Sequence, residues 1–117
     1  MFRFETLEIW KSSIAYGKRL YFVANDFPKS ETFALSDQLK RAAVSVSNNI
    51  AEGSGGTNKD FANFLKISIK SVLETVNILK FAESVGYIKK EKTDELYKEA
   101  EMLIRRITAF KNSLIRP

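Results

Sequence analysis

Hydrophobic residues recur at steps of three and four along four stretches of the chain, with polar residues between them. The stretches span residues 5–25, 30–53, 57–85 and 90–115. The first has its apolar stripe at Leu7, Trp10, Ile14, Gly17, Tyr21 and Ala24, and the last at Leu96, Ala100, Leu103, Ile107, Phe110 and Leu114. Residues three or four apart share one side of an α-helix, so each stretch predicts a helix that buries one face.

Proline and glycine separate these stretches. Pro28 follows the first one and cannot continue a helix. Gly53 and Gly86 close the second and third, and each is expected to take the left-handed conformation common just after a helix. At the start of the third stretch, Thr57 and Asp60 have the spacing of a capping box, with Asp in place of the usual Glu. The helices are therefore joined by short connections.

The order of these elements predicts the fold class. No tight hairpin dipeptide separates two alternating runs, so strands are not expected. Long amphipathic helices with short connections pack as antiparallel neighbours. We therefore predict an all-α protein, an up-down-up-down four-helix bundle formed by residues 1–117 as a single domain.

The third stretch has more apolar residues than one core-facing stripe can bury. Ile67, Leu73, Ile78 and Phe81 widen its apolar arc. A helix of a monomeric bundle buries about 100° of its surface, and surplus exposed apolar groups are typical of an interface. We expect the bundle to assemble with copies of itself into a ring or barrel, although scattered surface hydrophobes would explain the same residues.

Charge and composition limit the kinds of partner and location that the protein can have. The 19 Lys and Arg residues exceed the 14 Asp and Glu residues, which gives a net charge of +5. A positive surface favours polyanions such as RNA or DNA, but it also simply keeps a protein soluble. The N-terminus lacks the pattern of a signal peptide, and no stretch approaches the roughly 18 apolar residues of a membrane span. A cytoplasmic location without membrane contact is expected.

The sequence offers little for catalysis. It contains no histidine, the most common general base near neutral pH, and no cysteine. The glycine-rich loop at residues 53–59 departs from the phosphate-binding pattern and follows a helix where a strand is required. The carboxylates at residues 91–101 alternate with lysines, which disfavours a cation site. We predict no catalytic residue, no metal and no cofactor.

A polar stripe runs along the second predicted helix. It consists of Gln38, Arg41, Ser45, Asn49 and Glu52 at steps of three and four. The stripe is interpreted as a ligand-reading face, as the polar seam of a subunit interface, or as an ordinary solvated surface. Residues 42–51 include no charge, which is unusual for a fully exposed helix and favours partial burial.

A row of lysines follows the third predicted helix. Lys59, Lys66, Lys70 and Lys80 project within about 80° of one another at 100° per residue, and Glu74 interrupts the row. Ammonium groups spaced along a rigid helix suit phosphate contacts, which hold a nucleic acid without reading its sequence. The alternative is a solvated face with no ligand.

The second stretch also resembles a known family. Residues 38–53 read QLKRAAVSVSNNIAEG, with supporting matches at Phe27-Pro28, Glu31, Leu35, Phe61, Phe64-Leu65, Ser71, Glu74 and Gly86-Tyr87-Ile88. This pattern is similar to that of the bacterial four-helix-bundle family named for the large-subunit ribosomal RNA intervening-sequence protein. Lys70 departs from it, because a small residue is common there.

The resemblance implies a homopentameric barrel without catalytic residues. It extends to the accessory variability determinant of diversity-generating retroelements, a basic pentamer that binds a reverse transcriptase and nucleic acid. On this basis the polar stripe of residues 38–52 is interpreted as structural or inter-subunit contacts. Our leading hypothesis is a non-enzymatic homo-oligomer that binds RNA or DNA. The alternative is a scaffold for a reverse transcriptase or another protein, with no role for nucleic acid.

Overall fold

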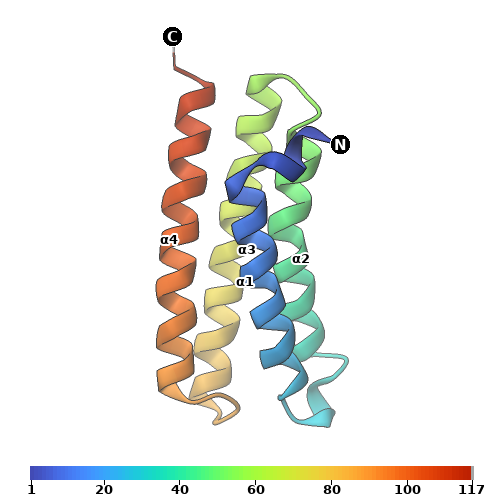
Figure 1. Ribbon diagram of the computed structural model, residues 1–117. Coiled ribbons are helices and arrows are strands. Elements are labelled where there is room, and N and C mark those ends of the chain that lie inside the picture. The colour runs from blue at the N-terminus through green and yellow to red at the C-terminus, as the bar shows by residue number, and fades with distance from the viewer. Residues whose placement is uncertain (117) are drawn as a thin grey trace.

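The computed structural model describes residues 1–116. In it the chain forms the bundle of four helices that the sequence predicts (Figure 1). The helices are α1 (Glu8–Asn25), α2 (Leu35–Gly53), α3 (Asn58–Ser84) and α4 (Lys90–Leu114), with short 3-10 turns η1 (Arg3–Thr6) and η2 (Lys29–Glu31). Successive helices run in opposite directions, and the molecule measures 47 × 23 × 20 Å. The all-α, up-down-up-down prediction is confirmed.

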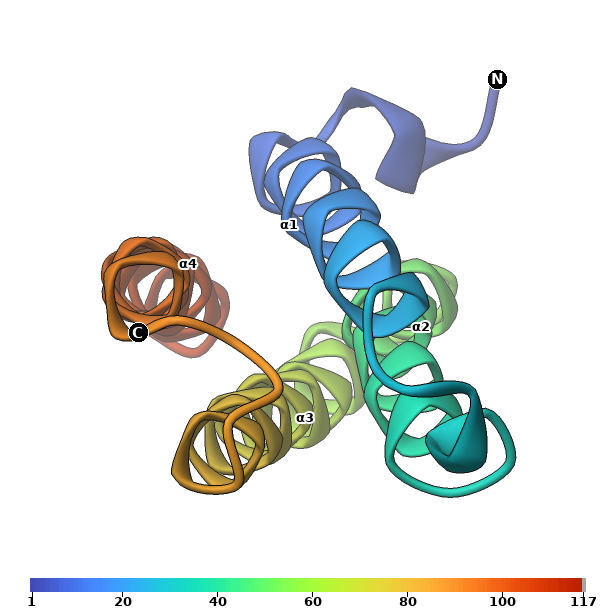
Figure 2. The ribbon, with the colours of Figure 1, turned by 90° about the horizontal axis from the view of Figure 1, so that it is seen from below.

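Each helix packs against two others. α2 contacts α1 and α3, and α4 contacts α3. A less extensive contact between α1 and α4 completes the ring of four helices. Figure 2 shows α1 and α3 on one diagonal and α2 and α4 on the other. The largest fully buried side chains come from all four helices: Tyr16, Leu20, Leu39, Ile50, Phe61, Leu65, Leu79, Leu96 and Ile107. Every helix therefore contributes to one continuous core.

The first two helices begin later than the sequence predicts. The first stretch was expected to be helical from residue 5 and the second from residue 30, but separate 3-10 turns occupy residues 3–6 and 29–31. Ala34 is non-helical and interrupts the run between η2 and α2. The Glu31 carboxylate then accepts a hydrogen bond from the Leu35 N–H at 3.4 Å, which satisfies a backbone donor in the first turn of α2.

The prediction for Gly53 was wrong, whereas that for Gly86 is confirmed. Gly86 has φ of +84°, a left-handed conformation that suits glycine. Gly53 has no such conformation and is the buried last residue of α2. It lies against Phe61 and Phe64 of α3, so the position requires a small residue because of close packing.

The capping box is also confirmed. The Thr57 hydroxyl accepts from the Asp60 N–H, and the Asp60 carboxylate accepts from the Thr57 N–H, both at 3.1 Å. These two bonds satisfy donors that have no partner within the helix, and they fix where α3 starts. The chain therefore reverses within residues 54–57, and α3 packs directly back onto α2.

Two connections are joined at the end of the bundle where α1 and α3 finish. The Tyr87 hydroxyl donates to Glu31 Oε2 at 2.9 Å, and the Tyr87 ring lies 5.8 Å from the ring of buried Phe27. The pKa of Tyr87 is raised because its phenol donates to this carboxylate. These contacts link the α1–α2 connection to the α3–α4 connection.

Candidate functional site

The predicted lysine row lies on the outer surface of α3. Lys59, Lys66, Lys70 and Lys80 are all exposed. Among residues 1–116, none of the four lies within 4 Å of a carboxylate oxygen, whereas Lys11, Lys90 and Lys92 do. The ammonium groups of the row therefore form no direct ion pair, although exposed Glu74 lies one turn after Lys70 on the same helix and the charge of Lys80 acts on Asp94.

The four lysines are not equivalent. Lys66 and Lys70 are one helical turn apart, and Lys59 lies in the first turn of α3. Lys80 is at the edge facing α4, where its Nζ lies 5.2 Å from the centre of the Tyr97 ring. This distance is typical of a cation–π contact, so Lys80 already has a partner. Lys66 and Lys70 are the two lysines of the row that lie one turn apart, and neither has an ion-pair or cation–π partner in residues 1–116.

Exposed apolar side chains accompany these lysines, as the wide apolar arc predicts. Leu73 is 55% exposed, Phe81 is 56% exposed, and Ile67 is also exposed. Ile78, which was expected to join them, is instead buried. The position of Ile78 on the helix turns it towards the core, so the surplus apolar surface of α3 comes from the other three residues.

The polar stripe on α2 divides into a half-buried part and an exposed part. Ser45 and Asn49 are half-buried at the seam with α3, where Ser45 Oγ lies 2.8 Å from Ser71 Oγ. The Asn49 side-chain amide donates to the Ser45 carbonyl oxygen at 2.8 Å and to its Oγ at 3.1 Å. The bond between Ser45 and Ser71 links α2 to α3. The network also occupies hydrogen-bonding groups of Ser45 and Asn49 that a ligand would otherwise use.

The remaining three residues of the stripe, Gln38, Arg41 and Glu52, are exposed. Arg41 Nε donates to Asp37 Oδ2 at 2.8 Å, one turn earlier on the same helix. Arg41 and Glu52 belong to a shallow polar groove of about 530 Å³, which is lined by Tyr21, Asp37, Lys40, Arg41, Val44, Ser45, Asn48, Asn49 and Glu52. Both signs of charge line this groove, so its lining favours neither an anion nor a cation.

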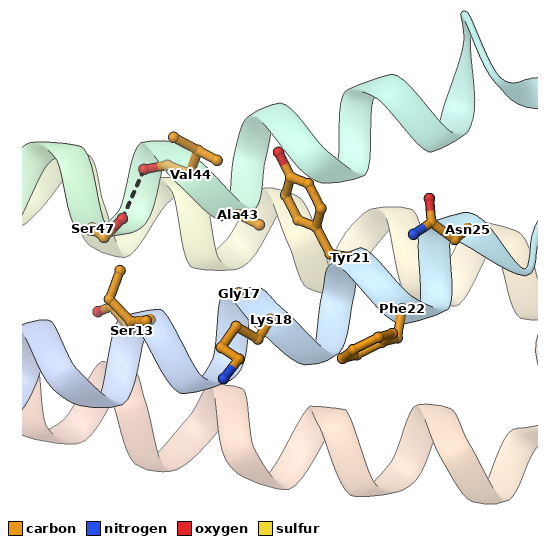
Figure 3. A pocket seen from close by; sticks show the side chains of 10 residues that line it. Ser13, Gly17, Lys18, Tyr21, Phe22, Asn25, Ala43, Val44 and Ser47 are labelled. Carbon is orange, nitrogen blue, oxygen red and sulfur yellow. Dashed lines mark hydrogen bonds between the residues drawn. The ribbon is translucent and has the colours of Figure 1, made fainter.

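An apolar groove between α1 and α2 adjoins the polar one. It measures about 400 Å³, and its walls include Ile14, Gly17, Tyr21, Phe22 and Val44. Figure 3 shows Tyr21 reaching from α1 towards α2, near Val44. Tyr21 and Val44 line both grooves, so the two form one hollowed surface. A bundle with such a surface offers protein or apolar ligands a place to pack.

The apolar groove was not predicted from the sequence. Ile14 and Tyr21 were expected in the core stripe of the first helix, but they are 37% and 41% exposed. Ala24 of the predicted stripe is buried, and Leu7 and Trp10 pack against the core while partly buried. The other buried residues of α1 are Ile9, Ser13, Tyr16, Leu20 and Val23. The first helix has two apolar stripes, and an exposed second stripe was the signal that could have indicated the groove.

Three of the five carboxylates of α4 form ion pairs with basic side chains. Lys90 Nζ lies 2.7 Å from Asp94 Oδ2, and Lys92 Nζ lies 3.7 Å from Glu95 Oε2. The hydrogen bond between the first pair lowers the pKa of Asp94 and raises that of Lys90. Glu99 pairs with Arg19 of α1. Within residues 1–116, no three acids gather in a group that could hold a metal ion.

None of the helices in residues 1–116 combines the length and apolar character required to cross a lipid bilayer.

Comparisons with known proteins agree with the sequence pattern. The family described as 23S rRNA-intervening sequence protein matches residues 5–109. A crystal structure of a protein of unknown function from the S23 ribosomal protein family of Bacteroides thetaiotaomicron has a TM-score of 0.81 to this chain. The two are 21% identical, and the similarity covers 89% of this chain and 95% of the other. The comparison with curated proteins found no match.

Proposed function

This chain belongs to the 23S rRNA-intervening sequence protein family, and we propose that it is a non-enzymatic bundle that self-associates and binds RNA or DNA through charge. The observation that carries the proposal is the row of exposed lysines on α3, none of which forms an ion pair within 4 Å in residues 1–116. Ammonium groups on a rigid helix contact phosphates without reading bases. Binding of this kind depends on electrostatics and tolerates many sequences.

Self-association would strengthen this charge. A single chain has a net charge of +5, so a pentamer would have five times that, +25. The apolar groove between α1 and α2 supports assembly, because Ile14, Tyr21, Phe22 and Val44 leave apolar surface that a second copy would cover. This surface is separate from the lysine row on α3, so a second copy that covers only this groove leaves the lysines accessible.

The first prediction concerns the mass of the protein in solution. At micromolar concentration we expect a particle of several chains, and a pentamer of 13.3 kDa chains has a mass of about 67 kDa. Light scattering coupled to size-exclusion chromatography measures this directly. A stable monomer of 13.3 kDa across the micromolar range would contradict the proposed assembly.

The second prediction concerns the lysine row. Replacing Lys59, Lys66 and Lys70 with glutamine is expected to weaken binding to unrelated RNA sequences by a similar factor, because phosphate contacts are lost. The slope of log K against log salt should become shallower by about 2 for a single strand, since each lost contact removes about 0.7. Fluorescence anisotropy over a range of salt concentrations gives both quantities.

The matched control removes the same charge elsewhere. Lys29, Lys89 and Lys98 are exposed and lie outside α3. Changing these three to glutamine should reduce affinity less and leave the slope closer to that of the unmodified protein. Equal effects of the two triple variants would contradict a binding site on α3. The absence of any RNA or DNA binding at low salt would contradict the proposed function itself.

The apolar groove favours a second candidate function, a scaffold for another protein such as a polymerase. In that case the groove would receive a partner protein rather than another copy, and nucleic acid would have no role. Purification from the native cell with nuclease treatment distinguishes the two: a protein partner that remains after digestion supports the scaffold, and one released by digestion supports the nucleic-acid proposal.

A further inference from the structure

We infer that the outer row of α3 prefers single-stranded to double-stranded nucleic acid, with Phe81 stacking against an unpaired base. This inference rests on the proposed function and specifies its ligand. The outer row consists of Lys66, Lys70, Leu73, Asn77 and Phe81, all of which are exposed.

The outer row is continuous along the helix. At 100° per residue, its five side chains project within about 80° of one another. Its length from Lys66 to Phe81 is about 22 Å at 1.5 Å per residue. An extended strand of a few nucleotides can follow this length, with phosphates near the two lysines and a base at the aromatic ring.

The composition of the outer row distinguishes the two forms of nucleic acid. Leu73 and Phe81 each leave more than half of their surface in contact with solvent. A duplex presents phosphates outside and keeps its bases stacked inside, so it gains little from apolar groups between lysines. A single strand offers the flat faces of its bases as well as its phosphates, and both parts of the row would then have a partner.

Phe81 is a better stacking surface than the other aromatic residue nearby. The ring of Tyr97 on α4 is covered on one side by the ammonium group of Lys80, at 5.2 Å. Phe81 has no such cation–π partner, and no aromatic ring is paired with it in residues 1–116. Its exposed face is therefore available for a base.

The outer row does not fit a lipid surface equally well. Asn77 lies between Leu73 and Phe81, and Lys70 precedes Leu73, so polar groups interrupt the apolar ones. Insertion into a bilayer requires a continuous apolar face, which an amphipathic membrane helix provides. Isolated apolar groups that follow two lysines match the separate bases and the phosphates of a single strand more closely.

The test compares Phe81→Ala with the unmodified protein. The probes are a fluorescein-labelled 20-nucleotide poly-U strand and a 20-base-pair duplex RNA, in the same buffer. Phe81→Ala is expected to weaken single-strand binding by roughly 5- to 150-fold, the effect of removing one stacked aromatic side chain. The salt slope should be unchanged because no charge is lost, duplex binding should change little, and Phe81→Trp should restore single-strand binding.

Phe33→Ala is the matched control, because Phe33 is 96% exposed and lies outside α3. It should bind both probes like the unmodified protein. Three results would overturn the inference while leaving the proposed function intact: equal affinity for the two probes, no loss with Phe81→Ala, or a smaller particle mass for Phe81→Ala, which would place Phe81 in a subunit contact. Stronger binding to anionic phosphatidylserine vesicles than to poly-U would also overturn it. Failure of both RNA probes to bind at low salt contradicts the proposed function.

Discussion

Gly53→Ala is expected to lower the free energy of unfolding by about 1–3 kcal/mol, the usual cost of overpacking a well-packed contact. A Cβ atom at this position would lie 2.7 Å from Phe64 Cβ, 2.8 Å from Phe61 Cδ1 and 3.3 Å from Phe61 Cα. Cα and Cβ atoms cannot rotate away, so α2 and α3 would have to separate. The cost should exceed the gain in helix propensity that alanine brings over glycine.

The matched control is Gly17→Ala, because Gly17 also lies within a helix. The nearest atoms to its Cβ would be Ala43 O at 3.8 Å and Ala43 Cβ at 3.9 Å, which are ordinary contacts. This variant should gain about 0.5–1 kcal/mol from helix propensity. Urea unfolding followed by circular dichroism measures both variants. A Gly53→Ala variant as stable as Gly17→Ala would mean that the helix contact is looser than the structure indicates.

Alkaline pH is expected to remove about 2–3 kcal/mol of stability through Tyr16. Its phenol is fully buried, and its oxygen lies 2.8 Å from Thr75 Oγ1. Burial raises the pKa of Tyr16 from 10.0 to about 12; the hydrogen bond to Thr75 opposes this shift, and the charge of Glu99 adds to it. The folded protein therefore holds a phenolic proton that the unfolded chain releases near pH 10.

The direction of this pH effect follows from the number of protons that the folded and unfolded states bind. Between pH 10 and pH 12 the folded state binds more protons than the unfolded state, so the free energy of unfolding falls as pH rises. Below pH 10 both states keep the proton and the contribution is fully present. A shift of about two pKa units corresponds to the 2–3 kcal/mol stated above.

Tyr16→Phe isolates this contribution. At pH 8 the variant should be less stable than the unmodified protein by about 1 kcal/mol, because one hydrogen bond is lost. Towards pH 12 the difference should disappear and then reverse, since only the unmodified protein contains the buried phenol. Tyr97→Phe removes a phenol on the surface, so its free energy of unfolding should change with pH in the same way as that of the unmodified protein. Parallel curves for Tyr16→Phe and the unmodified protein from pH 8 to pH 12 would contradict the prediction.

The candidate site could be predicted only in part. The lysine row on α3 was evident from spacing alone, because every residue of a regular helix has a fixed direction. The role assigned to Phe81 could not be predicted, since an apolar residue on a helix is equally compatible with a core position. Ile78 and Phe81 both widened the same apolar arc, but Ile78 is buried and Phe81 is exposed. The positions of α2 and α4 around α3 decide which of the two residues is buried and which is exposed.

Local patterns determined the secondary structure and the fold class of this protein. The repeat of three and four residues, together with Pro28, Gly86 and the Thr57–Asp60 capping box, set four helices and their order, because these features act over a few neighbouring residues. The tertiary structure decided which stripe of α1 entered the core and which formed the groove. It also requires a small residue at Gly53, because the atoms that exclude a side chain there belong to another helix. Contacts between helices depend on where their neighbours lie, and the periodicity of a single helix does not specify that.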